Sequence, residues 1–424
     1  MPTLTSILTL VFISIFVAIQ TICVLLYIRV LRNAGTNSIR SEGTVTSSPL
    51  KAAVVVSVRG KDPFLKQNLS ALLNQSYSNF NVFVVVDSQQ DSAWPDVMSV
   101  RELAPDRIHV SALETPLATC SLKCSSLAEA IERLDDSYEA VAFIDGDAHP
   151  FRDWLSDLLG PLQDRRVGVA TGNRWYAPSH GEWGSLVRYF WNAGAVVQVW
   201  LNGITWGGSM SLRTDVIQEI GLLEAMRHSF FDDAAVVRQI RKHGYRTAFV
   251  PSVMMANCEE IALSSFITWS ERQMIAARSA EAGRIMVAIH ACCILACIAM
   301  PFLTISMGIW ASDGMAIGVS IASFAIFWIA ALLSAMRIEQ AVQRIFRKNG
   351  VEARWSSWRT TLCFFPALVL SHFVYFRVLV GARMRTRVSW RGVEYMLLPK
   401  NAVRMVEYRP FVLPSGADVP ESIV

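Results

Sequence analysis

The stretch AVAFIDGDAHP, residues 140–150, ends an apolar run with two aspartates one residue apart. Its first half is predicted to be a buried strand of a parallel sheet, because such strands are nearly continuous apolar runs. Asp145 and Asp147 would then lie at the carboxyl end of the strand, where α/β sheets bind ligands. A polar turn and a divalent-cation site both explain these aspartates, so the stretch alone leaves the two interpretations open.

Short apolar runs alternate with amphipathic segments around this stretch, from residue 52 to about 260. AAVVVSV and FNVFVVVD are rich in β-branched residues, and the segment between them has apolar residues at helical spacing. Strands are expected at 52–58, 80–87, 106–113, 139–145 and 167–173, and helices at 125–134 and 154–162. This alternation predicts an α/β, Rossmann-like domain with a mostly parallel sheet.

The composition indicates membrane segments in addition to this domain. Of 424 residues, 52% are hydrophobic and only 17% are charged, whereas soluble domains carry about 25% charged residues. The net charge of +4 is small and no basic tail is present, so no nucleic-acid partner is expected. The eight cysteines lack the spacing of a zinc site or of a secreted disulfide framework.

Residues 5–28 form an uncharged run of about the length that spans a bilayer. The run is too long for a cleaved signal peptide and no cleavage site follows, so we expect a signal anchor. Two further runs, 285–310 and 314–336, are expected to form a transmembrane hairpin. Basic residues follow the anchor and the hairpin, which places the α/β domain in the cytoplasm. In a bacterium the protein would lie in the inner membrane.

The last apolar stretch, 361–382, is interrupted by Arg377. A full crossing would leave the arginines that follow it on the outer side, against the positive-inside rule. We therefore favour a re-entrant or interfacial helix over a full span, with both open.

These segments divide the chain into a membrane anchor, a linker, the α/β domain and a membrane-associated C-terminal part. The expected boundaries are an anchor at 1–35, a linker at 36–51, the catalytic domain at 52–262, an interfacial amphipathic helix at 263–284, the hairpin at 285–336, a basic cytoplasmic loop at 337–360, the third segment at 361–382 and a tail at 383–424.

A second acidic strand end accompanies the first. Asp87 closes FNVFVVVD, at the edge of the sheet where Asp145 and Asp147 are expected. Carboxylates at the D-x-D spacing can share one hard divalent cation and leave positions for phosphate oxygens. Such a cation would offset the charge that develops on a departing diphosphate.

Two other motifs have both a structural and a functional interpretation. Asp232 and Asp233 begin an amphipathic helix, where they could cap the helix or deprotonate an acceptor hydroxyl. Trp206-Gly207-Gly208-Ser209 could form a tight turn or let the backbone approach a ligand closely.

The order of these motifs resembles that of the membrane-bound family 2 glycosyltransferases, and most of all the ceramide glucosyltransferases. The resemblance covers about residues 52–280 and rests on SVRGKDPFLKQNLSALLNQSY, VVVDSQQD, LKCSSLAEAI, FIDGDAHP, GGSMSLRTDV and FFDDAAVVRQIRKHGYR. The closing VSWRGVEYMLLP looks like a C-terminal Trp-Arg-Gly signature of bacterial members.

The resemblance implies a glycosyltransferase A-type fold and a role for each matching residue. Asp233 would be the catalytic base beside Asp232, and Asp147, with Asp145, would hold Mn²⁺ or Mg²⁺. The implied nucleotide-sugar ligands are Asp87, Lys123, Asp145, Arg59, Gln273 and Arg272, and the implied acceptor ligands are Gly207, Gly208, Ser209, Met210 and Trp269.

One motif departs from the family pattern. Where the family has Gln-x-x-Arg-Trp, this chain has Gln273, but Ala276 and Ala277 replace the arginine and the tryptophan. In the family that arginine meets the diphosphate and that tryptophan lines the acceptor site. Arg272 and Arg278 are both candidates for the missing charge, and Trp269 lies two turns away from the missing ring.

The implied reaction is an inverting, metal-dependent transfer of a hexose, by family default glucose, from a UDP-sugar to a hydroxyl of a ceramide-like membrane lipid. A processive polysaccharide synthase is the second hypothesis, although those enzymes usually have more membrane helices. A catalytically silent homologue that binds nucleotide sugar or lipid is the third.

Overall fold

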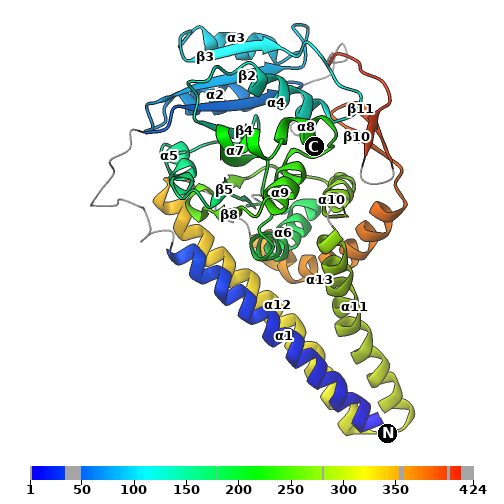
Figure 1. Ribbon diagram of the computed structural model, residues 1–424. Helices are drawn as coiled ribbons and strands as arrows, with labels where there is room; N and C mark the ends of the chain where they lie inside the picture. Colours follow the sequence, from blue (N-terminus) through cyan, green and yellow to red (C-terminus); the bar gives the residue numbers. More distant parts are fainter. Residues whose placement is uncertain are drawn as a thin grey trace.

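A seven-stranded sheet forms the centre of the α/β domain in the computed structural model, which describes residues 2–33, 49–178, 180–278, 281–352, 358–398 and 402–411 (Figure 1). The strand order is β3-β2-β1-β4-β7-β5-β8. The linker expected at 36–51 falls outside the described residues up to position 48.

Every neighbouring pair of strands in this sheet is parallel except the two pairs that β7 makes. The strands are β1 (Ala52–Val58), β2 (Phe80–Val86), β3 (Ile108–Ala112), β4 (Ala140–Asp145), β5 (Val167–Thr171), β7 (Ser209–Arg213) and β8 (Arg246–Phe249). The strands predicted from apolar runs and the mostly parallel α/β fold are therefore confirmed.

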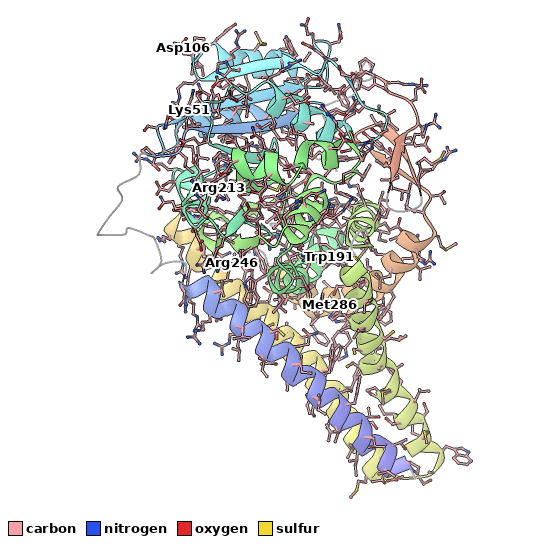
Figure 2. The ribbon with its side chains drawn as sticks, viewed as in Figure 1. Lys51, Asp106, Trp191, Arg213, Arg246 and Met286 are labelled. Atoms are coloured by element: carbon pink, nitrogen blue, oxygen red, sulfur yellow. The ribbon has the colours of Figure 1, made fainter. Side chains whose placement is uncertain are left out.

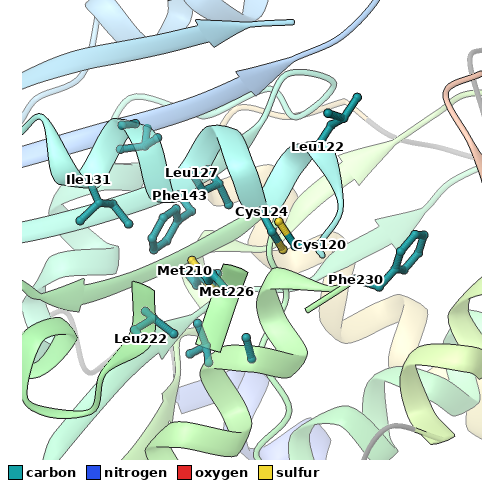
Figure 3. Close-up of a cluster of buried hydrophobic side chains, with 14 of the residues drawn as sticks. Cys120, Leu122, Cys124, Leu127, Ile131, Phe143, Met210, Leu222, Met226 and Phe230 are labelled. Carbon is teal, nitrogen blue, oxygen red and sulfur yellow. The ribbon is translucent and has the colours of Figure 1, made fainter. Parts of the chain in front are cut away.

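Helices cover both faces of the sheet, each over its own apolar core. One face carries α2 (Leu65–Leu73), α3 (Trp94–Arg101), α5 (Trp154–Leu159) and the 3₁₀ turn η1 (Gly160–Gln163); the other carries α4 (Leu122–Glu132), α7 (Thr214–Glu219), α8 (Leu222–Arg227) and α9 (Asp232–Lys242). Figure 3 shows the second core, where Phe143 of β4 and Met210 of β7 lie near Leu127 and Met226. The carboxyl ends of β1, β2 and β4 are thereby held in one rigid edge.

Three long helices extend away from this domain (Figure 1). They are α1 (Pro2–Asn33), α11 (Glu281–Trp310) and α12 (Gly314–Lys348), and α12 packs against both of the others. Thr304 and Ser320 share a hydrogen bond of 2.6 Å, and Ser320 donates to Ser6 at 3.3 Å. Hydrogen bonds of this kind stabilise the association of apolar helices in lipid, where the hydrophobic effect does not drive helices together.

Among the described residues, four helices are long and apolar enough to cross a membrane: these three and α13 (Trp358–Met384). The chain thus has the helices expected of an integral membrane protein. Helix α12 continues to Lys348, so residues 337–348, expected in a loop, are helical. Basic residues in its last turns do not end the helix, because arginine and lysine are good helix formers.

Helix α13 packs along α6 (Trp183–Leu201) and α10 (Leu263–Arg278). Figure 1 shows it in orange at the base of the α/β domain, where α1 and α12 come up beside it. Helix α6 has no counterpart among the predicted elements. Most of its residues are apolar, and its buried side carries Leu186, Tyr189 and Phe190.

The C-terminal segment is structured, which corrects the expectation of a plain tail from residue 383. Strands β10 (Arg387–Trp390), β11 (Val393–Leu397) and β12 (Val403–Met405) form an antiparallel sheet. The main-chain N–H of Met405 donates to Ala118 at 2.8 Å, and that of Leu122 to the Tyr395 hydroxyl at 3.2 Å. These bonds fasten the sheet to the start of α4. A short parallel pair, β6 (Arg174–Tyr176) and β9 (Met255–Asn257), and the 3₁₀ turn η2 (Pro251–Val253) complete the fold.

Candidate active site

A cavity of about 1090 Å³ lies at the carboxyl edge of the sheet and continues between the membrane helices. It collects most of the residues singled out in the sequence: Arg59, Asp87, Lys123, Asp145, Asp147, Gly207, Gly208, Asp232, Asp233, Trp269, Arg272 and Gln273. These residues come from strand ends, loops and the helices α4, α9 and α10, which lie far apart in the chain. The strand-end residues meet because the parallel strands of the sheet end at this edge.

The two aspartates of AVAFIDGDAHP lie on this edge, held in a turn by a bond of 3.0 Å from the Ala148 N–H to the Asp145 carbonyl. Arg174 donates to both carboxylate oxygens of Asp147, at 2.8 and 3.1 Å. Burial favours the neutral acid, but Arg174 outweighs it and holds the pKa of Asp147 at about 2. Asp147 is therefore ionised at neutral pH.

Lys123 links this pair of aspartates to the second acidic pair. Its ammonium lies 2.7 Å from Asp145 Oδ1 and 3.2 Å from Asp232 Oδ2. Burial alone lowers the pKa of Lys123, but the two carboxylates outweigh it and raise the pKa above the ordinary lysine value. The ammonium therefore stays charged and holds the two acidic motifs together.

Asp232 and Asp233 begin α9, as predicted. Asp233 is oriented by two contacts: its Oδ1 accepts from the Ala234 N–H at 2.7 Å, and its carbonyl accepts from the Thr205 hydroxyl at 3.2 Å. Burial, followed by repulsion from Asp232, raises the pKa of Asp233 to about 7. A carboxylate with that pKa can accept a proton near neutral pH, as a general base must.

Two glycines of the Trp-Gly-Gly-Ser motif allow the loop to touch both acidic pairs. A Cβ on Gly207 would lie 2.3 Å from Asp232 Oδ2, and a Cβ on Gly208 would lie 2.6 Å from Asp145 Oδ2. Any side chain at these positions would collide with a carboxylate, so the close approach of this backbone requires glycine.

Ser209 and Met210, predicted to contact the acceptor, do not line the cavity. Both are fully buried in β7; Ser209 accepts a hydrogen bond of 2.9 Å from Trp154 Nε1, and Met210 belongs to the apolar core. The strand begins directly after Gly208, so its residues point into the two cores and away from the cavity.

Asp87 and Arg59 form a buried ion pair at the end of β2. Arg59 also donates to the carbonyls of Arg391 and Arg409, each at 2.9 Å, and Asp87 accepts from the Phe411 N–H at 3.1 Å. Burial, only partly offset by Arg59, raises the pKa of Asp87. Its Oδ1 is buried and has no hydrogen-bond partner among the described residues, so a ligand in the cavity could use it.

The wall opposite the aspartates comes from α10 and the C-terminal sheet. Trp269 of α10 makes edge contacts with the rings of Tyr176 and Trp191, at 5.7 and 5.3 Å between centroids. Arg272 lies over the Trp390 ring at 5.5 Å. Ala276 lines the cavity without offering a charge or a ring.

Sequence reasoning missed three residues of the site. Arg174 follows the predicted strand 167–173, so its place at a strand end was a usable signal. Trp390 and Arg391 lie in the quoted VSWRGVEYMLLP signature, but nothing in the sequence says that this segment folds back onto the cavity.

The carboxylates are donors of the type that Mg²⁺ or Mn²⁺ takes, but they are only two: among the described residues no group of three or more His, Cys, Asp or Glu side chains is arranged to hold a metal ion. Asp145 and Asp147 offer hard oxygen donors, and their side chains are 25% and 30% exposed toward the cavity. Lys123 and Arg174 now balance their charge, so a cation at Asp147 would replace the contact with Arg174.

The other end of the cavity is mainly apolar and lies within the membrane helices. It is lined by Val24 of α1, Ile294 of α11, Phe327 of α12 and Leu368 of α13, together with a few polar side chains such as Gln20, His290 and His372. Figure 2 labels Trp191 and Met286, two further lining residues, where the base of the α/β domain meets α11. A polar reaction site and an apolar chamber thus belong to one continuous space.

A mostly parallel α/β sheet with acidic strand ends, a second acidic pair beside them and helices long enough to cross a membrane are features of membrane-associated glycosyltransferases. The chain belongs to glycosyl transferase family 21, the ceramide glucosyltransferase family, whose family model matches residues 9–403. The resemblance to that group is confirmed, and the enzyme is a glycosyltransferase.

Comparison with other proteins adds two structural relatives, each at low sequence identity. The mannosyltransferase PcManGT from Pyrobaculum calidifontis, solved with GDP-Man and Mn²⁺, is 18% identical over 88% of this chain and 99% of its own, with a TM-score of 0.45. GalNAc-T7, solved with UDP, GalNAc and Mn²⁺, is 11% identical over 50% of this chain and 44% of its own, with a TM-score of 0.38. No curated protein sequence matches the chain significantly.

Proposed function

We propose that this enzyme transfers a hexose, by family default glucose, from a UDP-sugar to the hydroxyl of a ceramide-like membrane lipid, with inversion at the sugar. One observation carries the proposal. A single cavity joins Asp145, Asp147 and Asp233 to an apolar chamber between helices that can cross a membrane. A water-soluble donor and a lipid acceptor can meet in such a space without either leaving its own phase.

In the proposed reaction, the lipid hydroxyl oxygen attacks C1 of the sugar on the face opposite the diphosphate. The C1–O bond to UDP breaks and its electron pair leaves with the diphosphate, while Asp233 removes the hydroxyl proton. The raised pKa of Asp233, about 7, suits this task because the group is ionised just above neutral pH yet basic enough to take the proton.

Asp145 and Asp147 would hold Mn²⁺ or Mg²⁺, which would stabilise the negative charge of the leaving diphosphate. Lys123 keeps the two acidic pairs in position, and Asp87 offers a carboxylate oxygen to the nucleoside. Trp269 and the glycine loop at 207–208 border the space left for the acceptor. The positive-inside rule places this machinery on the cytoplasmic face.

The test is an assay with purified enzyme in lipid nanodiscs containing ceramide, with UDP-glucose and Mn²⁺. Mass spectrometry is expected to detect ceramide carrying one hexose. A polymer would favour the processive synthase, and no transfer or hydrolysis with any of several UDP-sugars and lipids would contradict the proposal.

A substitution in the chamber separates acceptor entry from donor chemistry. Ala331→Trp would fill the cavity from α12 and is expected to raise KM for the lipid while slow hydrolysis of UDP-glucose persists. Ile329→Trp is the matched control, because Ile329 lies on the same helix and is 56% exposed on the outside. Equal effects of the two substitutions would argue against acceptor binding in the chamber.

A further inference from the structure

Two arginines on the wall opposite the D-x-D aspartates have no acidic partner. Arg272 of α10 and Arg391, at the turn between β10 and β11, both line the cavity. Within the described part of the chain, neither makes an ion pair with a carboxylate. Three other arginines of the cavity do: Arg59 with Asp87, Arg174 with Asp147 and Arg188 with Glu259. Arg238 and Arg241 of α9 also line the cavity without an ion pair, but both are exposed, whereas Arg272 and Arg391 are partly buried.

The two unpaired guanidinium groups lie close enough to repel each other, which shows in the pKa of Arg272. Burial, followed by repulsion from Arg391, lowers the pKa of Arg272 to about 10. Across the cavity, Arg391 attracts Asp147 and lowers its pKa, although less strongly than Arg174 does. Two like charges in a partly enclosed space are unfavourable by themselves, and an anion between them would relieve the repulsion.

The positions of both arginines are built into the fold. Arg391 adopts a positive φ of 46°, a backbone conformation that residues with side chains rarely take. It exchanges two hydrogen bonds with Arg59: its Nη1 donates to the Arg59 carbonyl at 2.8 Å, and its own carbonyl accepts from Arg59 Nε at 2.9 Å.

Arg272 of α10 is held by Trp390, the residue before Arg391 in the hairpin of β10 and β11. Its guanidinium lies over the Trp390 ring at 5.5 Å, and arginine stacks favourably on aromatic faces. The turn Trp390-Arg391-Gly392 therefore supplies one cation and orients the other. The fixed positions, the absence of acidic partners and the facing carboxylates are the features of an anion site with a cation site opposite.

We propose that Arg391 and Arg272 bind the diphosphate of the sugar donor, so that the C-terminal hairpin is part of the donor site. The planar guanidinium fork matches phosphate oxygens in pairs, which suits a nucleoside diphosphate. The inference rests on the proposed function, because it assigns the diphosphate of that same donor. Ala276 stands where the family has the arginine that meets the diphosphate, so α10 has no cation at that position. Arg391 provides one from the hairpin instead.

The same contacts connect the hairpin to the nucleoside end of the site. Arg59 pairs with Asp87 and also holds the Arg391 carbonyl. Arg59 thus fixes Arg391 and contacts Asp87 at the same time. The hydrogen bonds of Arg59 therefore set the spacing between the nucleoside position at Asp87 and the diphosphate position at Arg391.

The test compares the binding of UDP and of uridine to the full-length enzyme by isothermal titration calorimetry in the presence of Mg²⁺. Arg391→Gln keeps a donor for the Arg59 carbonyl but removes the charge. We expect Kd for UDP to rise roughly ten- to a hundredfold, the usual effect of losing a charge-assisted hydrogen bond. Kd for uridine should stay within about twofold, because uridine has no phosphate.

Arg387→Gln is the matched control. It makes the same charge change in the same hairpin, but its partner is Glu394 and the two side chains are 56% and 47% exposed. Arg272→Gln should reproduce the selective loss of UDP affinity, and Arg391→Lys should recover part of it.

Three results would overturn the inference. They are an unchanged Kd for UDP in both Arg391→Gln and Arg272→Gln, a parallel loss of UDP and uridine affinity that points to a structural role, and a loss of the same size in Arg387→Gln. Wild-type enzyme that binds no nucleoside diphosphate would instead overturn the proposed function itself.

Discussion

The two walls of the cavity differ in how their charged side chains are paired. We call them the sheet wall, which carries Asp145 and Asp147, and the hairpin wall, which is formed by α10 and the hairpin of β10 and β11. On the sheet side, the carboxylates of Asp145 and Asp147 already have basic partners, Lys123 and Arg174. On the side of α10 and the C-terminal hairpin, Arg272 and Arg391 line the cavity and are in no ion pair with a carboxylate of the described residues.

The charges of one wall are therefore balanced within the protein, whereas those of the other wall would be balanced by the bound substrate. The sheet wall is neutralised before any ligand arrives, which keeps its carboxylates ionised and in place. The two arginines of the hairpin wall are in no ion pair and interact with Asp62, Asp91 and Asp147 only at longer range, so a bound anion would add the close partner that they lack. A donor diphosphate would contact both walls, so each wall should respond differently to substitution.

The largest expected effect is on the sheet wall. Asp233→Asn should lower kcat by roughly 10²- to 10⁴-fold, the usual contribution of a general base, and leave Kd for UDP nearly unchanged. Rates of transfer to lipid and UDP titrations measure the two quantities. Asp215→Asn is the control, because Asp215 is 54% exposed and neither it nor its partners Arg165 and Arg213 line the cavity. Normal turnover in Asp233→Asn would refute the assignment of the base.

The pH dependence of the rate should follow the same residue. Asp233 must be ionised to accept a proton, and its pKa is about 7. The rate should therefore fall as the pH drops below 7, by about tenfold per pH unit, and level off above it. Transfer rates measured from pH 5 to 9 under saturating substrate give this profile.

Lys123→Gln sharpens this test. Lys123 lowers the pKa of Asp233, so its removal should move the acidic limb of the profile to higher pH. A limb that moves to lower pH, or does not move, would contradict the coupling between the two acidic pairs.

The binding of Mn²⁺ in the absence of nucleotide tests how the sheet wall is neutralised. Arg174→Gln removes the two hydrogen bonds that Asp147 accepts and should strengthen Mn²⁺ binding by roughly tenfold, measured by electron paramagnetic resonance. Arg166→Gln breaks a similar two-bond contact with Asp164 at the surface and should have no effect. Weaker Mn²⁺ binding in Arg174→Gln would show that Arg174 supports the cation site.

The smallest expected effect lies on the solvent side of the hairpin wall. Arg387→Gln removes an exposed ion pair with Glu394 and should change the free energy of unfolding by less than about 1 kcal/mol. Thermal unfolding in nanodiscs checks it. A larger loss would mean that the outer face of the hairpin also supports the site.

The sequence predicted the sheet wall well because its signals are local. β-branched runs mark β1, β2 and β4, and the aspartates that follow them reach the cavity simply because parallel strands end on one edge. The predicted start of α9 at Asp232 also depends only on neighbours in the chain. The absence of Ser209 and Met210 from the cavity lining has a local reason too, since β7 begins at Ser209, two residues earlier than a lining loop that included both would need.

On the other wall, the sequence predicted the helix α10 with Trp269 and Arg272, but it did not predict the C-terminal hairpin. Strands β10 to β12 are three to five residues long and carry charged positions, so their pattern is weak. Their place depends on contacts with residues hundreds of positions away, such as that between Arg391 and Arg59. Helix α6, which forms the base of the cavity, was also missed, although its partners α10 and α13 were expected as helical segments.

The sequence by itself thus determined a mostly parallel α/β domain, apolar helices long enough for a membrane and the acidic motifs of the site. These follow from period, composition and strand-end position, which neighbouring residues set. Only the tertiary structure decided that Lys123 and Arg174 neutralise the aspartates and that Trp390 and Arg391 face them. Such pairings depend on which distant segments come within a few ångströms, and electrostatic interactions depend on that distance rather than on order along the chain.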